Sequence, residues 1–128
     1  MKTYNTTMPN RSRVYLAAAL MIAGLIFAAS VTTFAQNLHL HSDVVRAHST
    51  DVYHMTFVGH EWEVLVVSGD GSTDLDLYVY DENGNLIAKD EDDTDDCVVR
   101  FIPRWTGDFT VKVMNRGGYS NRYTLGTN

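Results

Sequence analysis

The sequence has few cysteines, few basic residues and, beyond its N-terminal segment, no helical periodicity. Cys97 is the only cysteine among 128 residues, so the chain can form no internal disulfide. The lack of a 3.6-residue apolar repeat excludes a helical bundle. Lys and Arg number ten against sixteen Asp and Glu, which gives a formal net charge of −6. Such a chain repels nucleic acid and anionic membranes, so neither is an expected partner.

Residues 1–35 predict a secretory signal peptide helix. A basic start precedes an apolar run of about 16 residues at positions 14–29, and small residues lead to Ala35. A membrane-spanning helix needs ~20 apolar residues, so we predict cleavage after Ala35 rather than a retained membrane anchor. Cleavage leaves 93 residues, with seven basic and sixteen acidic side chains and a formal charge of −9. The expected location is the periplasm or the extracellular medium.

Apolar residues recur with a period of two after residue 50, which predicts β-strands. In the clearest stretch Leu75, Leu77 and Val79 alternate with polar residues, so they share one face of a strand. Short strands at close spacing predict one antiparallel sandwich or barrel over residues 51–128. The expected strands are Val52–Phe57, Glu61–Ser68, Asp74–Tyr80, Leu86–Lys89, Cys97–Ile102, Gly107–Val113 and Arg122–Leu125.

Three local features add detail to this arrangement. The apolar run Val64–Val67 predicts a strand that is buried on both faces. The pair Asn83-Gly84 predicts a tight hairpin turn, because this turn needs residues that tolerate a positive φ. Residues 36–50 have no clear pattern and predict a loosely held N-terminal arm.

Two acidic stretches, at positions 70–76 and 90–96, are candidate cation sites. Their carboxylates are the hard oxygen ligands that calcium prefers. They do not form an EF-hand loop, because neither possible register has glycine at the sixth position. The alternative is a solvated acidic edge that prevents aggregation between sheets. The candidate calcium ligands are Asp70, Asp74, Asp76, Asp92 and Asp93.

Tyr78 and Tyr80 are the candidate partner-binding residues. Both alternate with Leu77 and Val79, so the pattern places them together on the outer face of their strand. Exposed aromatic side chains often mark binding surfaces, which favours a contact with a protein or a polysaccharide. The alternative is a cross-strand aromatic pair that only stabilises the sheet.

No catalytic residue is predicted. The tripeptide His41-Ser42-Asp43 contains the residue types of a catalytic triad, but adjacent residues cannot converge as a triad requires. Cys97 alternates with Val99 and Phe101, which is typical of a small core residue rather than a nucleophile. We therefore expect no enzymatic activity.

The segments VVSGDGSTDLDLYVYDENGNLIAKDED, FIPRWTGDFTVKVMN and YTLGTN occur in this order within residues 66–128. Together they resemble the bacterial pre-peptidase C-terminal domain, and they are similar to the collagen-binding domains of clostridial collagenases. The resemblance implies a jelly-roll-like antiparallel β-sandwich of about eight strands over residues 51–128. It also implies a non-catalytic module, here expected as a stand-alone secreted copy.

The same resemblance implies calcium binding at Asp74 and Asp76, with Asp70 as a further ligand. The collagenase domains take several ligands from an acidic segment before their first strand. In this chain the corresponding segment, residues 36–50, has Asp43 as its only acidic residue. The sequence thus predicts a secreted, non-catalytic β-sandwich that binds a protein or polysaccharide, with calcium as the expected stabilising ion. The alternative is a structural, chaperone-like or inhibitor-like accessory to a separately encoded secreted peptidase.

Overall fold

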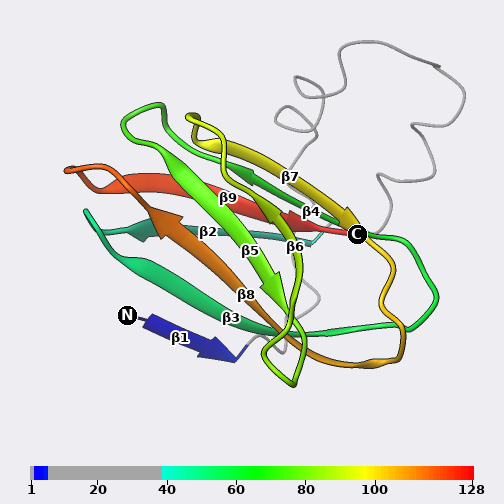
Figure 1. Ribbon diagram of the computed structural model, residues 1–128. Coiled ribbons are helices and arrows are strands. Elements are labelled where there is room, and N and C mark those ends of the chain that lie inside the picture. Colours follow the sequence, from blue (N-terminus) through cyan, green and yellow to red (C-terminus); the bar gives the residue numbers. More distant parts are fainter. Residues whose placement is uncertain (1, 6–38) are drawn as a thin grey trace, which may run out of the picture.

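The computed structural model describes residues 2–5 and 39–128 (Figure 1). Within these residues the chain forms strands and no helix, and so no helix there is able to cross a membrane. The predicted signal peptide helix covers residues 1–35, and most of it lies outside the described residues. The part that is described, residues 2–5, forms a strand. The strands are β1 (Lys2–Asn5), β2 (His39–Val45), β3 (Thr50–Phe57), β4 (Glu63–Ser68), β5 (Leu75–Tyr80), β6 (Leu86–Asp90), β7 (Asp96–Phe101), β8 (Gly107–Asn115) and β9 (Asn121–Thr127).

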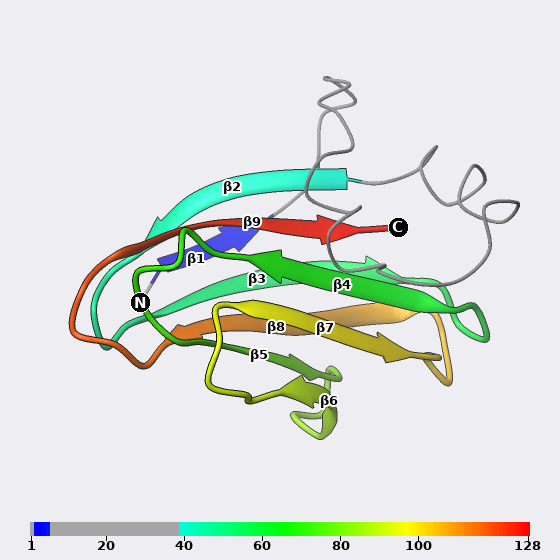
Figure 2. The same ribbon diagram turned by 90° about the horizontal axis from the view of Figure 1, so that it is seen from above.

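The strands form two sheets that pack face to face (Figures 1 and 2). One sheet has the order β1-β3-β8-β5-β6, and the other has the order β2-β9-β4-β7. From β2 to β9 every neighbouring pair is antiparallel, and every connection except β5–β6 passes from one sheet to the other. The predicted all-β antiparallel sandwich of about eight strands is confirmed. β1 adds a parallel strand at the β3 edge.

The core consists of the inward-facing apolar side chains of both sheets. On β8, for example, Phe109, Val111 and Val113 are buried and alternate with more exposed residues. Burying a side chain of this size contributes ~1.5–3 kcal/mol. The apolar residues that alternate in the sequence are therefore also the main contributors to the stability of the fold. At one end Phe57, Phe101 and Phe109 pack with ring centroids 5.3 to 6.1 Å apart.

A polar group also lies in the core. The Tyr123 hydroxyl donates to Asp51 Oδ2 at 3.0 Å and is hydrogen-bonded to the Tyr53 hydroxyl, and all three residues are buried. These bonds link β3 of one sheet to β9 of the other. Burial and the contacts with Tyr53 and Asp51 raise the pKa of Tyr123, so its phenol stays neutral in the folded protein.

Two expectations from the sequence are wrong. Val64 and Val66 are partly exposed, because the sheet that contains β4 is covered on one face only. Residues 39–49 are not a loose arm: β2 pairs with β9 along its full length, and Val45 is fully buried. This edge strand is held by backbone hydrogen bonds to β9 and by the burial of Val45 at its end. Such a strand does not need alternating apolar side chains, so its sequence shows no clear pattern.

Candidate functional site

The two acidic stretches meet at one end of the sandwich. The β4–β5 loop carries most of the first stretch, and the β6–β7 loop carries most of the second. Backbone hydrogen bonds join them, from Gly69 N to Asp95 O at 2.9 Å and from Leu75 N to Thr94 O at 3.0 Å. The Asp95 carboxylate also accepts a bond from Gly71 N at 2.5 Å, where Gly71 has a φ of +81°. Two acidic segments that are separate in the sequence thus form one acidic end.

Two of the predicted ligands at this end hold the loops in shape. Asp70 accepts from Ser72 N at 3.1 Å and from Arg122 N at 3.0 Å. Asp92 accepts from Thr94 N at 2.9 Å and from the Thr94 hydroxyl at 2.7 Å. The Ser72 side chain and the Arg122 N–H lower the pKa of Asp70, and Thr94 lowers the pKa of Asp92 in the same way. Both carboxylates are therefore ionised and already have partners.

Asp76 is held in an ionic network on the outer face of β5. Its side chain is buried, and Arg116 Nε donates to its Oδ2 at 2.5 Å. The Tyr78 hydroxyl lies 2.9 Å from the same oxygen and 2.7 Å from Glu91 Oε1, and it accepts from Arg116 Nη2 at 2.9 Å. The arginine neutralises the Asp76 charge at the position where the resemblance implies a cation.

Asp74 has a buried carboxylate oxygen that is not used in the described part of the fold. Its Oδ1 is buried and has no hydrogen-bond partner among the described residues. Burial raises the pKa of Asp74, and the charges of Asp76, Asp93 and Asp92 raise it further. These four carboxylates thus share one negative field, although no three Asp, Glu, His or Cys side chains in the described residues are arranged to hold a metal ion.

The structure corrects the predicted exposure of the tyrosines. Tyr78 is only 7% exposed, because its hydroxyl is enclosed by Asp76, Glu91 and Arg116. Tyr80 is partly exposed, stacks on Tyr78 with ring centroids 6.3 Å apart, and has Lys112 Nζ 4.8 Å from its ring centre. The two rings therefore form a supported pair within the sheet rather than an open aromatic surface.

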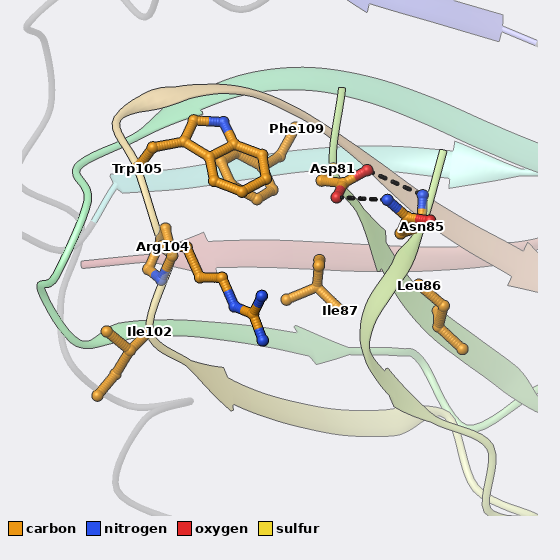
Figure 3. A pocket seen from close by; sticks show the side chains of 9 residues that line it. Asp81, Asn85, Leu86, Ile87, Ile102, Arg104, Trp105 and Phe109 are labelled. Atoms are coloured by element: carbon orange, nitrogen blue, oxygen red, sulfur yellow. Dashed lines mark hydrogen bonds between the residues drawn. The ribbon is translucent and has the colours of Figure 1, made fainter. Parts of the chain in front are cut away.

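A cleft of about 430 Å³ lies at the opposite end of the sandwich (Figure 3). It opens between the β5–β6 hairpin and the β7–β8 loop, where the last strand of one sheet faces the other sheet. Its apolar lining comes from Leu86, Ile87, Ile102, Pro103, Trp105 and Phe109. Its polar lining comes from Asp81, Asn85 and Arg104.

The hairpin wall of the cleft is held rigid by Asp81. Its carboxylate accepts from Asn83 N at 2.9 Å, from Asn85 N at 2.8 Å and from Asn85 Nδ2 at 2.9 Å. The Asn85 side chain contributes most to lowering the pKa of Asp81. Gly84 completes the turn with a φ of +80°, as the Asn83-Gly84 pair predicts. The turn presents Leu86 and Ile87 on the edge strand β6, 47% and 39% exposed.

The opposite wall is built on a close contact between two loops. His60 N donates to Pro103 O at 2.8 Å, and Gly59 N donates to the Thr106 hydroxyl at 2.9 Å. A Cβ at Gly59 would lie 2.6 Å from the Trp105 carbonyl carbon, so only glycine allows this approach. The contact fixes the β7–β8 loop, whose Ile102 and Trp105 are 45% and 36% exposed. Buried Phe109 lies beneath them.

The sequence did not identify this cleft, although signals for it exist. Ile102 and Trp105 are large apolar residues in a connection, and Leu86 and Ile87 are consecutive apolar residues immediately after a turn. Neither pair fits an alternating pattern, and such residues are exposed when no element covers them.

Cys97 is buried, as predicted, and its thiol donates to Leu75 O at 3.0 Å. Burial raises the pKa of this thiol, with nearby aspartates adding to the effect, so it is not a thiolate nucleophile. Of the triad residue types on β2, the Ser42 hydroxyl bonds to Thr124 and Asp43 accepts from Val44 N.

No protein-family model matches the chain, and no curated protein matches it either. Several solved structures share its fold, among them a collagenase domain and a lysozyme inhibitor. The pre-peptidase C-terminal domain of a collagenase from Bacillus anthracis is 14% identical, with a TM-score of 0.56, over 70% of this chain and 88% of that one. Aeromonas hydrophila PliG, described as a periplasmic inhibitor of g-type lysozyme, is 11% identical, with a TM-score of 0.55, over 81% and 91%. The predicted likeness to the pre-peptidase C-terminal domain is confirmed for the fold.

Proposed function

We propose that the protein is a non-catalytic β-sandwich that binds another protein through the cleft between the β5–β6 hairpin and the β7–β8 loop. The observation that carries this proposal is the exposure of four large apolar side chains, between 36% and 47%, around one cleft. Exposed apolar groups that gather in one place mark interaction sites, and tryptophan is enriched at the residues that dominate binding. The four side chains are Leu86, Ile87, Ile102 and Trp105.

The solved structures of the same fold support a protein partner. One of them is part of a collagenase, and the other is described as an inhibitor of a lysozyme, which is itself a protein. The second favours the alternative predicted from the sequence, an inhibitor-like accessory to a separate enzyme. The buried Cys97 thiol, which donates to Leu75 O, supports a role without catalysis.

We propose that this binding takes place in the periplasm or outside the cell. The basic, apolar and small-residue regions of residues 1–35 support secretion, and PliG is described as periplasmic. Removal of residues 1–35 would also remove β1 and leave β3 as the edge of its sheet. Mass spectrometry of the exported protein tests this, because the predicted product begins at Gln36.

We also propose a weak calcium site at the acidic end. Asp74 would bind through its unpartnered Oδ1, and Asp76, Asp93 and Asp92 are close enough to raise its pKa. Asp70, on the same β4–β5 loop, is the fifth candidate ligand. A bound cation would neutralise their shared field and hold the β4–β5 and β6–β7 loops together. A ligand at 100 times its Kd stabilises by about 2.7 kcal/mol, so melts with excess calcium and with chelator test this site. Asp74→Asn should remove the difference, and equal melting temperatures for the unmodified protein would contradict the site.

The binding proposal is tested with two protein probes. The purified protein is immobilised and exposed to a g-type lysozyme and to collagen, and lysozyme activity on cell walls is measured in parallel. Ile87→Asp and Trp105→Ala should each weaken the bound complex more than tenfold, since residues that dominate an interface contribute ~2 kcal/mol or more. Trp62→Ala is the matched control, because Trp62 is 63% exposed and does not line the cleft. Binding that depends on Trp62 and not on the cleft variants would contradict the assignment.

A further inference from the structure

We infer that the cleft receives an extended segment of its protein partner that carries an aliphatic side chain and an acidic side chain two residues apart. This inference rests on the proposed function. The aliphatic group would fill the apolar part of the cleft, and the carboxylate would pair with Arg104. The structure supports each half of this motif through separate features.

Arg104 is the cation available to such a carboxylate. Its side chain is exposed, runs over the cleft from the β7–β8 loop (Figure 3), and forms no ion pair within the described residues. Lys89 pairs with Glu91 and Arg116 pairs with Asp76, whereas the remaining arginines make no ion pair within the described residues. Among these arginines, Arg104 is the one that lines the cleft.

The acidic residues around the cleft do not neutralise Arg104. The Asp81 carboxylate accepts three hydrogen bonds from its own hairpin, which use both of its oxygens. The Glu82 carboxylate lies toward Gly107, 3.6 Å from where a Cβ would stand there, and makes no ion pair with Arg104. The guanidinium is thus a planar, permanently charged donor beside an apolar surface, which suits a single carboxylate.

Charge decides between a carboxylate and larger anions. The net charge of −6 repels polyanions such as nucleic acid, whereas one carboxylate meets Arg104 at short range. Ile87 and Trp105 shield the pair from water when a partner covers them, which strengthens the attraction relative to an open surface. A partner segment with one acidic residue among neutral ones therefore fits better than an acidic run.

The edge position of β6 predicts the conformation of the segment. β6 is the last strand of its sheet in the described residues, so no further strand is hydrogen-bonded in a ladder along its outer side. β7 of the other sheet lies near it, and Val98 N of β7 donates to the Asp90 side chain, at the end of β6 away from the cleft. Extended peptides add to such edges, and residues two apart then point to the same side. If the partner's chain continues along β6 beyond Arg104, its C-terminus is not at the cleft. The carboxylate must then belong to a side chain. The expected motif is aliphatic-x-acidic, where x is any residue.

The test uses a matched pair of short peptides and isotope-labelled protein. The first peptide is Ac-Thr-Leu-Thr-Glu-Thr-NH2, and the second has Gln in place of Glu, so the two differ only in charge. We expect the Glu peptide to shift the NMR signals of the Trp105 indole N–H and the Ile87 amide, with at least tenfold tighter binding than the Gln peptide. Arg104→Gln should remove this preference. Arg100→Gln should keep it, because Arg100 is exposed on β7 outside the cleft.

The inference is overturned if the two peptides bind equally, if the preference survives Arg104→Gln, or if millimolar Glu peptide shifts no cleft signal. These outcomes are separate from failure of the proposed function. A protein partner whose binding is weakened by Ile87→Asp but unaffected by Arg104→Gln would retain the protein-binding cleft and remove only the acidic motif. A peptide with a free C-terminal carboxylate and no Glu serves as a further probe, and tighter binding of that peptide would also overturn the side-chain motif.

Discussion

Replacing Tyr78 with Phe separates a structural role of this tyrosine from the partner-binding role that its sequence pattern suggests. The ring stays, and only the hydroxyl is lost. In the structure this hydroxyl contacts Asp76 Oδ2 at 2.9 Å, Glu91 Oε1 at 2.7 Å and Arg116 Nη2 at 2.9 Å. Its single proton serves one carboxylate at a time, and Asp76 is the buried one, 3% exposed. We therefore expect Tyr78→Phe to destabilise the fold rather than to affect partner binding.

The magnitude follows from the charge of the acceptor. A hydrogen bond to a charged group contributes ~1.5–3 kcal/mol, and loss of one such bond at Asp76 should cost about 2 kcal/mol. For a domain of 60–100 residues each kcal/mol lowers Tm by about 4–8 °C, so Tm should fall by roughly 8–16 °C. Thermal unfolding followed by circular dichroism measures this change.

Tyr80→Phe is the matched control for this experiment. The neighbouring ring stacks on Tyr78 and lies under Lys112, and both contacts survive loss of its hydroxyl. We expect a change within about 0.5 kcal/mol for this variant. Equal Tm values for Tyr78→Phe and Tyr80→Phe would refute the network as a source of stability.

The pH dependence provides a second measurement of the same network. Burial raises the pKa of Tyr78, and hydrogen bonds to Glu91 and Asp76 add to the rise. The folded state thus favours the neutral phenol, and this stabilisation is complete below the unfolded pKa of about 10 and decreases as the pH rises above it. Above pH ~10 the unmodified protein should lose stability more steeply than Tyr78→Phe. Parallel alkaline unfolding curves would contradict the network.

Three further predictions follow from single residues. With chelator present, Asp74→Asn should stabilise the protein at pH 7, because burial and nearby carboxylates raise the pKa of Asp74, and the gain should disappear below about pH 4; melts at both pH values check this. Cys97 should react with thiol reagents only as the protein unfolds, so rapid native labelling would contradict its burial. Gly59→Ala should cost ~1–3 kcal/mol in denaturant melts, since its Cβ would overlap the Trp105 backbone, whereas Gly118→Ala, with its nearest neighbour at 3.9 Å, should cost less.

The fold could be predicted from the sequence because each main strand shows its buried face. Phe109, Val111 and Val113 alternate on β8, and Cys97, Val99 and Phe101 alternate on β7, so a period of two alone identifies the core. The prediction was wrong for β2 and β4, because in these two strands the pattern of apolar residues does not match the pattern of burial. β2 is held mainly by its backbone pairing with β9, and β4 carries valines on its exposed face as well.

The candidate site was less predictable because it depends on contacts between distant loops. The sequence identified Asp74 and Asp76, but not that Arg116, forty residues later, neutralises Asp76. It placed Tyr78 on the correct face of β5, but that face is covered there by Glu91 and Arg116. Long-range polar partners leave no local periodicity, so composition reveals the acidic residues and not their pairing.

The two ends of the sandwich differ in what a partner would gain by covering them. At the acidic end Asp70 and Asp92 already accept hydrogen bonds from the chain, and a partner that excludes water there must offset the desolvation of several charges. At the cleft, covering Ile87 and Trp105 removes apolar surface from water and is favourable by about 25 cal/mol per Å². Binding energy for a neutral protein surface is therefore available at the cleft rather than at the acidic end. The same aspartates that make the acidic end prominent in the sequence make it the less favourable place for a protein interface.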